Sequence, residues 1–358
     1  MRLLPVVMIL AIVLCCARQC VELAFASESE VEAATAIPDP ESGQGRAENA
    51  GRALLGQIAP AVKLKTIDGD TIDLAELYGK QPVYLKFWAT WCVPCREQML
   101  AFARDYEALK DKATVVAINT GFNETLEGVR RYRQRYGLRM PIVIDDGRLT
   151  AALNLRVTPQ HVVIGRDGRI LYVGHLEDAT LQQAFAAALK QEGGGSAVQT
   201  LESDPTFGVG DKPYGLKSVE TAAGTFPVVG PLAGRDLRAI LFFSPWCESY
   251  LAKSNPQTAE ACRRGRLAVN QLSQQRGLRW LGIASGLWAS EKDLADYRKE
   301  SEIGIPLTLD GSGRLFRAFG VHDVPTIILV DHDGRIVSRI DPKVANPAER
   351  IRAVVDGE

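Results

Sequence analysis

The sequence predicts an α/β protein made of two similar domains in tandem, each a central mixed β-sheet flanked by helices. Three observations support this prediction. Short apolar runs of the buried-strand type alternate with segments of helical spacing. The two halves of the chain repeat the same landmarks in the same order. Finally, 358 residues with 46% hydrophobic and 24% charged residues are enough for two ordinary globular domains.

The internal repeat is the most informative of these observations. Its longest stretch aligns MPIVIDDGRLTAALNLRVTPQHVVIGRDGRILYVG (140–174) with IPLTLDGSGRLFRAFGVHDVPTIILVDHDGRIVSR (305–339). Pro159 and Pro325 then hold equivalent positions. Two shorter pairs precede this stretch in the same order: VYLKFWATWCVPC (83–95) with AILFFSPWCESY (239–250), and KLKTIDGDTIDL (63–74) with GLKSVETAAGTF (215–226). The two copies have diverged, but the order and approximate spacing of their landmarks are kept.

Within each copy the expected order of elements is strand, helix, strand, helix, β-hairpin and helix. In the first copy the apolar runs predict strands at 83–88, 114–119, 161–164 and 170–173. The turn Arg166-Asp167-Gly168-Arg169 joins the last two strands as a hairpin. The helical patterns lie at 97–110, 124–136 and 181–191.

The first 26 residues are typical of an export signal. Arg2 precedes an apolar run at 3–14, and Ala24-Phe25-Ala26 offers the small residues of a cleavage site. The run is shorter than the roughly 20 residues of a membrane span. We therefore expect cleavage after Ala26, with an uncleaved anchor or a lipoprotein as alternatives. The protein is then periplasmic or otherwise extracytoplasmic, and membrane-anchored if the signal is not cleaved.

Two further segments are poor in large apolar residues. Residues 27–50 are predicted to form a disordered acidic tether, and residues 192–205 a flexible linker. This division leaves residues 51–191 as the first domain and residues 206–358 as a degenerate second domain. The formal net charge of −1 argues against nucleic acid or an anionic membrane as the main partner. No cofactor and no metal are expected.

Four cysteines remain after removal of the signal, because Cys15, Cys16 and Cys20 all lie within it. An exported protein meets an oxidising compartment, in which disulfide bonds persist. The even count and the spacings suggest two pairs, Cys92–Cys95 and Cys247–Cys262.

The Cys-Val-Pro-Cys segment stands where an apolar strand meets a helix. There the unpaired amides and the dipole of the helix N-terminus favour the thiolate of Cys92, which is the nucleophile in disulfide exchange. Cys95 lies one turn further on, and Pro94 fixes the backbone of that turn. A purely structural disulfide or half of a zinc site are the alternatives, but no second cysteine pair or histidine pair lies nearby to complete four zinc ligands.

The segment Phe87-Trp88-Ala89-Thr90-Trp91-Cys92-Val93-Pro94-Cys95, followed by Val157-Thr158-Pro159, resembles the active site of the TlpA/ResA/DsbE-type thioredoxin-like proteins. The resemblance covers residues 56–190 and implies a thioredoxin-like fold for each copy. It implies that Cys92 attacks and Cys95 resolves. It also implies a cis Thr158-Pro159 peptide that faces the disulfide and pairs with an extended client chain, so that Trp91, Pro94, Thr158 and Pro159 contact the substrate.

Three polar residues near this segment have open roles. Lys86 holds the strand position that is a carboxylate in thioredoxin itself, six residues before the first cysteine. Its cation would favour a nearby thiolate, or its side chain snorkels to solvent and takes no part. Glu97 tunes the cysteine pair or caps the helix. His161 is expected to be a hydrogen-bonded sheet residue rather than a proton shuttle.

The second copy keeps Trp246-Cys247 and Val324-Pro325, but Tyr250 replaces the second cysteine. Cys262 would lie about 22 Å from Cys247 on one continuous helix, too far for a disulfide. Asn255-Pro256 is expected to break that helix and to let the chain fold back. The bond is then structural or redox-active, or Cys247 is a lone thiol. Pro325 keeps the signature of a peptide-binding loop, and Trp280 and Trp288 are expected in the core or at its rim.

These observations predict a thiol–disulfide oxidoreductase outside the cytoplasm. By resemblance it reduces exported client proteins, as in cytochrome c or metalloprotein maturation, with electrons from a membrane thiol donor of the DsbD/CcdA type. The alternatives are a disulfide oxidase or isomerase, and a non-enzymatic client-binding or Cu(I)-handling module built on Cys92 and Cys95. A peroxidase is disfavoured because the chain lacks a Pro-x-x-x-Thr-x-x-Cys segment.

Overall fold

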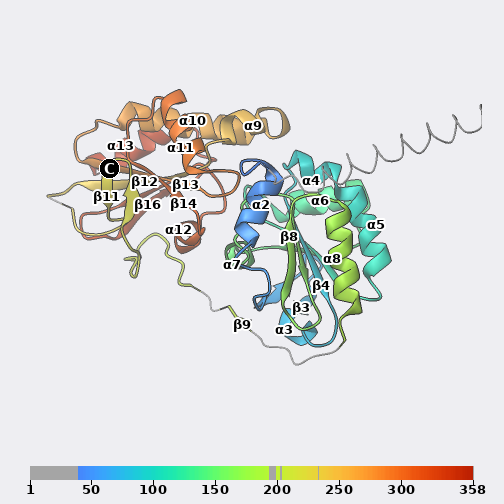
Figure 1. Cartoon of the computed structure of the whole chain (residues 1–358). Coiled ribbons are helices and arrows are strands. Elements are labelled where there is room, and N and C mark those ends of the chain that lie inside the picture. Colours follow the sequence, from blue (N-terminus) through green and yellow to red (C-terminus); the bar gives the residue numbers. More distant parts are fainter. Residues whose placement is uncertain (1–38, 193–198, 202–203, 233, 358) are drawn as a thin grey trace, which may run out of the picture.

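The computed structural model describes residues 39–192, 199–201, 204–232 and 234–357. The expected export signal lies outside these residues. The described chain forms two α/β units that lie side by side (Figure 1). None of the described helices has both the length and the apolar character that a bilayer span requires.

The first unit is built on a five-stranded sheet with the strand order β6-β5-β4-β7-β8. Strands β4, β5 and β6 are parallel, β7 runs antiparallel to β4, and β7 and β8 form an antiparallel hairpin. The five strands are β4 (Val83–Trp88), β5 (Thr114–Asn119), β6 (Ile142–Ile144), β7 (Gln160–Ile164) and β8 (Ile170–Gly174). The helices are α2 (Gly43–Gly51), α3 (Leu74–Leu77), α4 (Val93–Glu97), α5 (Met99–Leu109), α6 (Leu126–Tyr136), α7 (Arg148–Ala152) and α8 (Ala179–Lys190).

The second unit repeats this topology, with the strand order β14-β13-β12-β15-β16. Its sheet strands are β12 (Leu237–Phe243), β13 (Leu278–Ser285), β14 (Leu307–Asp310), β15 (Thr326–Val330) and β16 (Ile336–Ile340). Its helices are α9 (Cys247–Ser254), α10 (Pro256–Leu272), α11 (Glu291–Glu300), α12 (Arg314–Ala318) and α13 (Pro347–Asp356). Short strands pair outside the two sheets: β2 (Lys63–Lys65) with β3 (Thr71–Asp73), and β10 (Val219–Thr221) with β11 (Gly224–Phe226).

The central strands of both sheets are covered on both faces, which explains their nearly continuous apolar sequences. All six residues of β4 are buried, including Lys86. In each unit, an aspartate at the end of the third sheet strand caps the helix that follows it. Asp145 accepts hydrogen bonds from the amides of Leu149 and Thr150, and Asp310 accepts from those of Leu315 and Phe316. The buried carboxylates thereby satisfy amides at the start of α7 and α12 that have no partner within their helix.

The predicted disordered tether is wrong for its last residues. Helix α2 begins after Ser42, whose side chain accepts a hydrogen bond from the amide of Gly45, and the helix packs on β8. A Cβ atom on Gly51 would lie 2.4 Å from the Val173 side chain, so the contact requires a residue without one. The glycine- and alanine-rich composition that indicated disorder is therefore what permits close packing. Residues 27–38 lie outside the described part of the chain.

Two smaller expectations also differ from the structure. Within the predicted flexible linker, β9 (Gln199–Thr200) pairs in parallel with β1 (Pro60–Ala61), because the exposed edge of β1 offers it backbone partners. The predicted helix at 97–110 is interrupted at Gln98, which ends α4 and precedes α5. The carbonyl of Gln98 accepts a hydrogen bond from the Lys86 ammonium.

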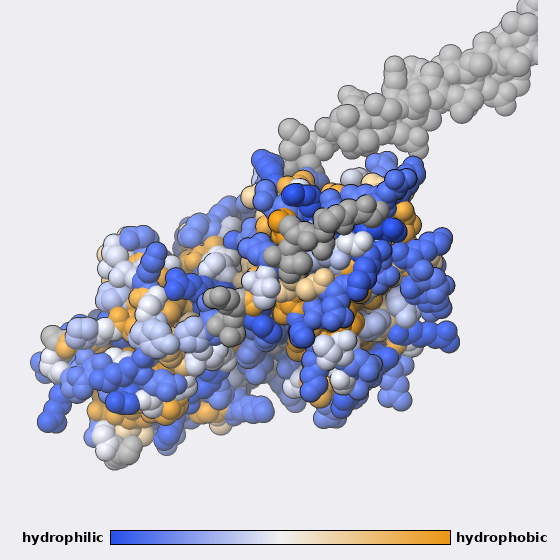
Figure 2. Space-filling view, turned by 90° about the horizontal axis from the view of Figure 1, so that it is seen from below, coloured by the Kyte–Doolittle hydropathy of each residue, from blue (hydrophilic) through white to orange (hydrophobic). Residues whose placement is uncertain are grey.

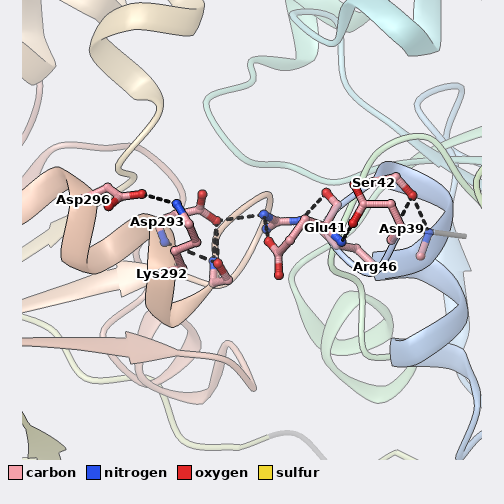
Figure 3. A network of polar contacts seen from close by, with 9 residues as sticks. Asp39, Glu41, Ser42, Arg46, Lys292, Asp293 and Asp296 are labelled. Carbon is pink, nitrogen blue, oxygen red and sulfur yellow. Dashed lines mark hydrogen bonds and ion pairs between the residues drawn. The ribbon is translucent and has the colours of Figure 1, made fainter.

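The two units share a packed interface. One hydrophobic cluster extends through both, and includes Trp91 and Phe122 from the first unit and Phe316 from the second. A polar contact lies at its edge, where the Arg46 guanidinium on α2 contacts Asp293 on α11 at 2.9 Å (Figure 3). On the face seen from below, hydrophilic and hydrophobic residues are interspersed (Figure 2).

Candidate active site

The Cys92–Cys95 pair lies at the junction of β4 and α4. Cys92 is the N-cap residue of α4, and its Sγ atom accepts a hydrogen bond from the amide of Cys95 at 3.1 Å. The two sulfurs are joined in a disulfide bond. Pro94 lies in the first turn, as expected. The helix therefore directs its unpaired amides toward the sulfur that would carry the negative charge after reduction.

A loop that ends in Pro159 contacts this pair. The Thr158-Pro159 peptide is cis, and the Sγ atom of Cys92 lies 3.3 Å from the carbonyl oxygen of Thr158. The indole of Trp91 donates a hydrogen bond to the carbonyl of Phe122 at 2.7 Å, which fixes the ring beside the disulfide. The fold thus brings together the residues that the sequence assigned to catalysis and substrate contact.

The second unit covers the disulfide. The phenol oxygen of Tyr250 accepts a hydrogen bond from the amide of Val93 at 3.0 Å, one of the amides at the start of α4. The ring of Trp246 lies 5.0 Å from that of Trp91. Cys92 is only 2% exposed.

Trp288 of the second unit lies on the proline loop of the first. Its amide donates to the carbonyl of Arg156 at 2.7 Å, and its indole donates to the Thr158 hydroxyl at 3.3 Å. Trp288 has a φ of 54°, a left-handed conformation that is rare for a bulky residue. The backbone edge expected to receive an extended client chain is therefore occupied by the loop between β13 and α11.

The equivalent loop of the first unit makes the reciprocal contact. Asn123, with a φ of 53°, donates from its amide to the carbonyl of His322 at 2.8 Å. Its side-chain oxygen accepts from the amide of Val324 at 2.9 Å. Each unit thus donates one backbone amide to the equivalent carbonyl of the other unit's proline loop, three residues before the proline.

Lys86 is buried and ion-paired, so the snorkelling alternative is wrong. Its ammonium lies 2.7 Å from Glu177, and the two side chains are 0% and 11% exposed. Desolvation lowers the pKa of Lys86, while the carboxylate of Glu177 opposes that shift. Burial raises the pKa of the neighbouring Asp105 to about 6, and the charge of Glu177 adds to this increase. The cation compensates for acidic groups that would otherwise be buried without a partner.

The other two polar residues have simple surroundings. Glu97 is exposed at the end of α4, and in the described part of the chain it makes no hydrogen bond. His161 is buried in β7, where its two ring nitrogens contact the Tyr84 hydroxyl at 2.7 Å and the Gln98 side-chain oxygen at 3.0 Å. Burial, and secondly the Lys86 cation, lower its pKa well below the ordinary value. His161 is therefore a bonded sheet residue, as expected.

Glu124, which precedes α6, is a further residue of the site that was not predicted. Its carboxylate accepts hydrogen bonds from the amide and hydroxyl of Thr90 at 2.5 and 2.9 Å, and from the Asn119 side chain at 3.0 Å. Burial raises its pKa. These bonds fix the turn directly before Trp91. No local pattern indicated this role, because the contact joins segments 34 residues apart.

In the second unit Cys247 and Cys262 are bonded, which excludes the lone thiol. Helix α9 ends at Ser254 and α10 begins at Pro256, so the chain reverses at Asn255 as expected. In the described ranges, no group of three or more His, Cys, Asp or Glu side chains is placed to hold a metal ion.

The buried ion pair gives a test of the role of Lys86. Replacing Lys86 with Met leaves the Glu177 carboxylate buried without its cation, and we expect this change to destabilise the first unit by about 3–5 kcal/mol. The double variant Lys86→Met/Glu177→Gln should recover most of the loss, because no unpaired charge remains. Urea unfolding at pH 7 measures both effects. A cost below about 1 kcal/mol for the single variant would show that the pair is not structurally important.

The first unit is similar to known thioredoxin-like proteins. Residues 55–173 match the AhpC/TSA family. The thioredoxin-like protein YneN of Bacillus subtilis (strain 168) is 36% identical over 131 residues, which are 36% of this chain and 76% of YneN. The thiol-disulfide oxidoreductase ResA of Halalkalibacterium halodurans is 37% identical over 141 residues, covering 38% of this chain and 78% of that protein.

Among solved structures, a thiol:disulfide interchange protein of the thioredoxin family from Chlorobium tepidum TLS shares 27% identity, with a TM-score of 0.34. The match covers 37% of this chain and 95% of that one. The sequence relationships to YneN and ResA span most of those proteins, and the first unit carries the disulfide, the proline loop and the sheet order described above. The chain therefore belongs to the thioredoxin-like thiol-disulfide oxidoreductases of the ResA type.

Proposed function

We propose that this oxidoreductase reduces disulfide bonds in exported client proteins through Cys92 and Cys95. The observation that carries the proposal is the position of Cys92, which caps α4 and lies 3.3 Å from the Thr158 carbonyl. The helix amides favour the thiolate, and the proline loop offers a backbone edge to the client beside it.

The reaction uses two exchange steps. The Cys92 thiolate attacks one sulfur of the client disulfide, forms a mixed disulfide and releases the other client sulfur as a thiolate. Cys95 then loses its proton and attacks Cys92, which restores the Cys92–Cys95 bond and releases the second client thiol. Two electrons pass from the pair to the client. A membrane dithiol donor of the DsbD/CcdA type, which the family resemblance implies, would return the pair to its reduced form.

The proposed extracytoplasmic location and the proposed class of client rest on different observations. Two disulfide bonds are formed in the described chain, and disulfides persist in oxidising compartments. Together with the apolar run near the N-terminus, this supports an extracytoplasmic site of action. The reducing direction and a role in cytochrome c or metalloprotein maturation rest on the family resemblance, because the geometry serves exchange in either direction.

A protein client requires the two units to separate. Trp288 bonds the Arg156 carbonyl and the Thr158 hydroxyl, and Tyr250 covers the amide of Val93. A client strand would compete for the same groups. Each hydrogen bond or aromatic contact at these groups contributes about 0.5–1.5 kcal/mol, which the client strand would have to replace.

Cysteine variants test the assigned roles. Cys95→Ser should accumulate a mixed disulfide between Cys92 and a small peptide disulfide, because the resolving thiol is absent. Cys92→Ser should lose at least about 100-fold of the reduction rate, because the attacking thiol is absent. Thiol release and mass spectrometry follow both effects. Glu97→Gln is the matched control on the same helix and should retain the wild-type rate. Full activity of Cys92→Ser would overturn the assignment.

The direction of exchange is tested by the reduction potential of the pair. We expect a value near or below about −270 mV, that of thioredoxin, from equilibration in glutathione or dithiothreitol buffers and thiol counting by mass spectrometry. A value near about −120 mV, that of the oxidant DsbA, would contradict the reducing direction and favour an oxidase.

A further inference from the structure

We propose that the Cys247–Cys262 disulfide is a second site of thiol–disulfide exchange, in which Cys262 is the sulfur that reacts with the client. The proposal concerns only the second unit and does not depend on the chemistry of Cys92 and Cys95. It reverses the roles that the sequence alignment suggests, because Cys247 is the residue aligned with Cys92.

The position of Cys262 against the second proline loop is the main evidence. Its Sγ atom lies 3.7 Å from the carbonyl oxygen of Val324, the residue before Pro325. Cys92 has the same relation to Thr158, at 3.3 Å. The Sγ atom of Cys247 lies instead near the Thr258 carbonyl, at 3.9 Å. A sulfur from α10 has thus taken the place beside the client edge that the first unit gives to its attacking cysteine.

Gly265 makes this position possible. It lies three residues after Cys262, on the same face of α10. A Cβ atom there would lie 2.8 Å from Cγ and 2.9 Å from Cβ of Pro325, so a larger residue would push α10 away from the loop. Glycine inside a helix costs about 1 kcal/mol relative to alanine. The close approach of helix and loop accounts for its presence here.

The sulfurs of Cys262 and Cys247 differ in their exposure and in their position relative to a helix start, as an attacked sulfur and a leaving sulfur should. Cys262 is partly exposed and lines a small surface hollow with Glu248, Arg266 and Pro325. Cys247 is 0% exposed and begins α9, where the helix amides and dipole favour a thiolate. A sulfur whose thiolate is stabilised leaves faster in disulfide exchange. Attack on the accessible Cys262 would therefore release Cys247 as the better leaving group.

The second proline loop already binds a backbone segment in this structure. The amide of Val324 donates to the Asn123 side chain at 2.9 Å, and the carbonyl of His322 accepts from the Asn123 amide at 2.8 Å. A client strand could form equivalent bonds when the two units separate. The loop is therefore able to position a chain beside Cys262.

The exchange balances without an additional reagent. A client thiolate attacks Sγ of Cys262, the bond to Cys247 breaks, and Cys247 leaves as a thiolate that takes up a proton from water. A second thiolate of the same client then attacks the client sulfur of the mixed disulfide and releases Cys262. The client gains a disulfide, and the Cys247–Cys262 pair gains two electrons. The reverse sequence reduces a client disulfide.

Single-cysteine forms of this site test the proposal. In a full chain carrying Cys92→Ser and Cys95→Ser, Cys247→Ser leaves only Cys262 at the second site, and Cys262→Ser leaves only Cys247. Both proteins are incubated with oxidised glutathione, and the modified peptides are quantified by mass spectrometry after circular dichroism has shown that the proteins are folded. We expect Cys262 to be modified at least about tenfold faster than Cys247.

Adding Gly265→Ala to the form that retains Cys262 should slow its reaction, while Leu267→Ala, an exposed change on the same helix, should not. Equal or faster modification of Cys247 would overturn the proposed roles. The intact Cys247–Cys262 bond in the Cys92→Ser/Cys95→Ser protein should also open in glutathione buffer without denaturant. If it opens only on unfolding in urea, the bond is structural and the proposal is wrong. Neither result depends on the function of the first unit.

Discussion

Each unit places one loop on the proline loop of the other unit, and the relative position of the two units depends on these two contacts. Asn123 and Trp288 occupy equivalent places, both adopt left-handed backbone conformations, and each donates its amide to a carbonyl of the opposite proline loop. The four hydrogen bonds of these residues amount to a few kcal/mol. These bonds add to the hydrophobic contacts between the two units.

The same arrangement explains how the second unit has diverged. Its first helix has lost the second cysteine of the motif, and Tyr250 stands in that place and binds the amide of Val93. The second cysteine is instead on α10, where Gly265 allows it to reach the proline loop. One scaffold thus presents sulfur to the same loop in two ways, at the start of a helix in one unit and from the middle of a helix in the other.

Much of the fold was predictable because its signals are local. The buried strands, the break at Asn255-Pro256 and both disulfides follow from apolar runs, proline and cysteine spacing. Helix α2 was missed because glycine and alanine carry no apolar periodicity, although they allow close packing on β8. The environment of Lys86 was left open since its partner, Glu177, lies 91 residues away.

The interface between the units could not be predicted in the same way. Trp288 was expected in the core or at its rim, and the sequence carries no sign that it binds the first proline loop. Asparagine is common in left-handed conformations, so an ordinary turn is enough to explain Asn123. Tryptophan is uncommon in that conformation. Only the tertiary structure shows that these two residues perform the same task. The cover over Cys92 is likewise formed by residues more than 150 positions away.

The most direct test of this account is the rate at which Cys92 is alkylated in the reduced protein. Trp288→Ala removes the indole bond to the Thr158 hydroxyl, and Tyr250→Phe in addition removes the bond to the Val93 amide. We expect the double variant to be alkylated about tenfold faster than the wild type, the effect of losing about 1.4 kcal/mol of closure. Tyr214→Ala, an exposed aromatic change elsewhere on the second unit, should leave the rate unchanged. An identical rate in the double variant and the wild type would contradict the claim that the second unit closes the site.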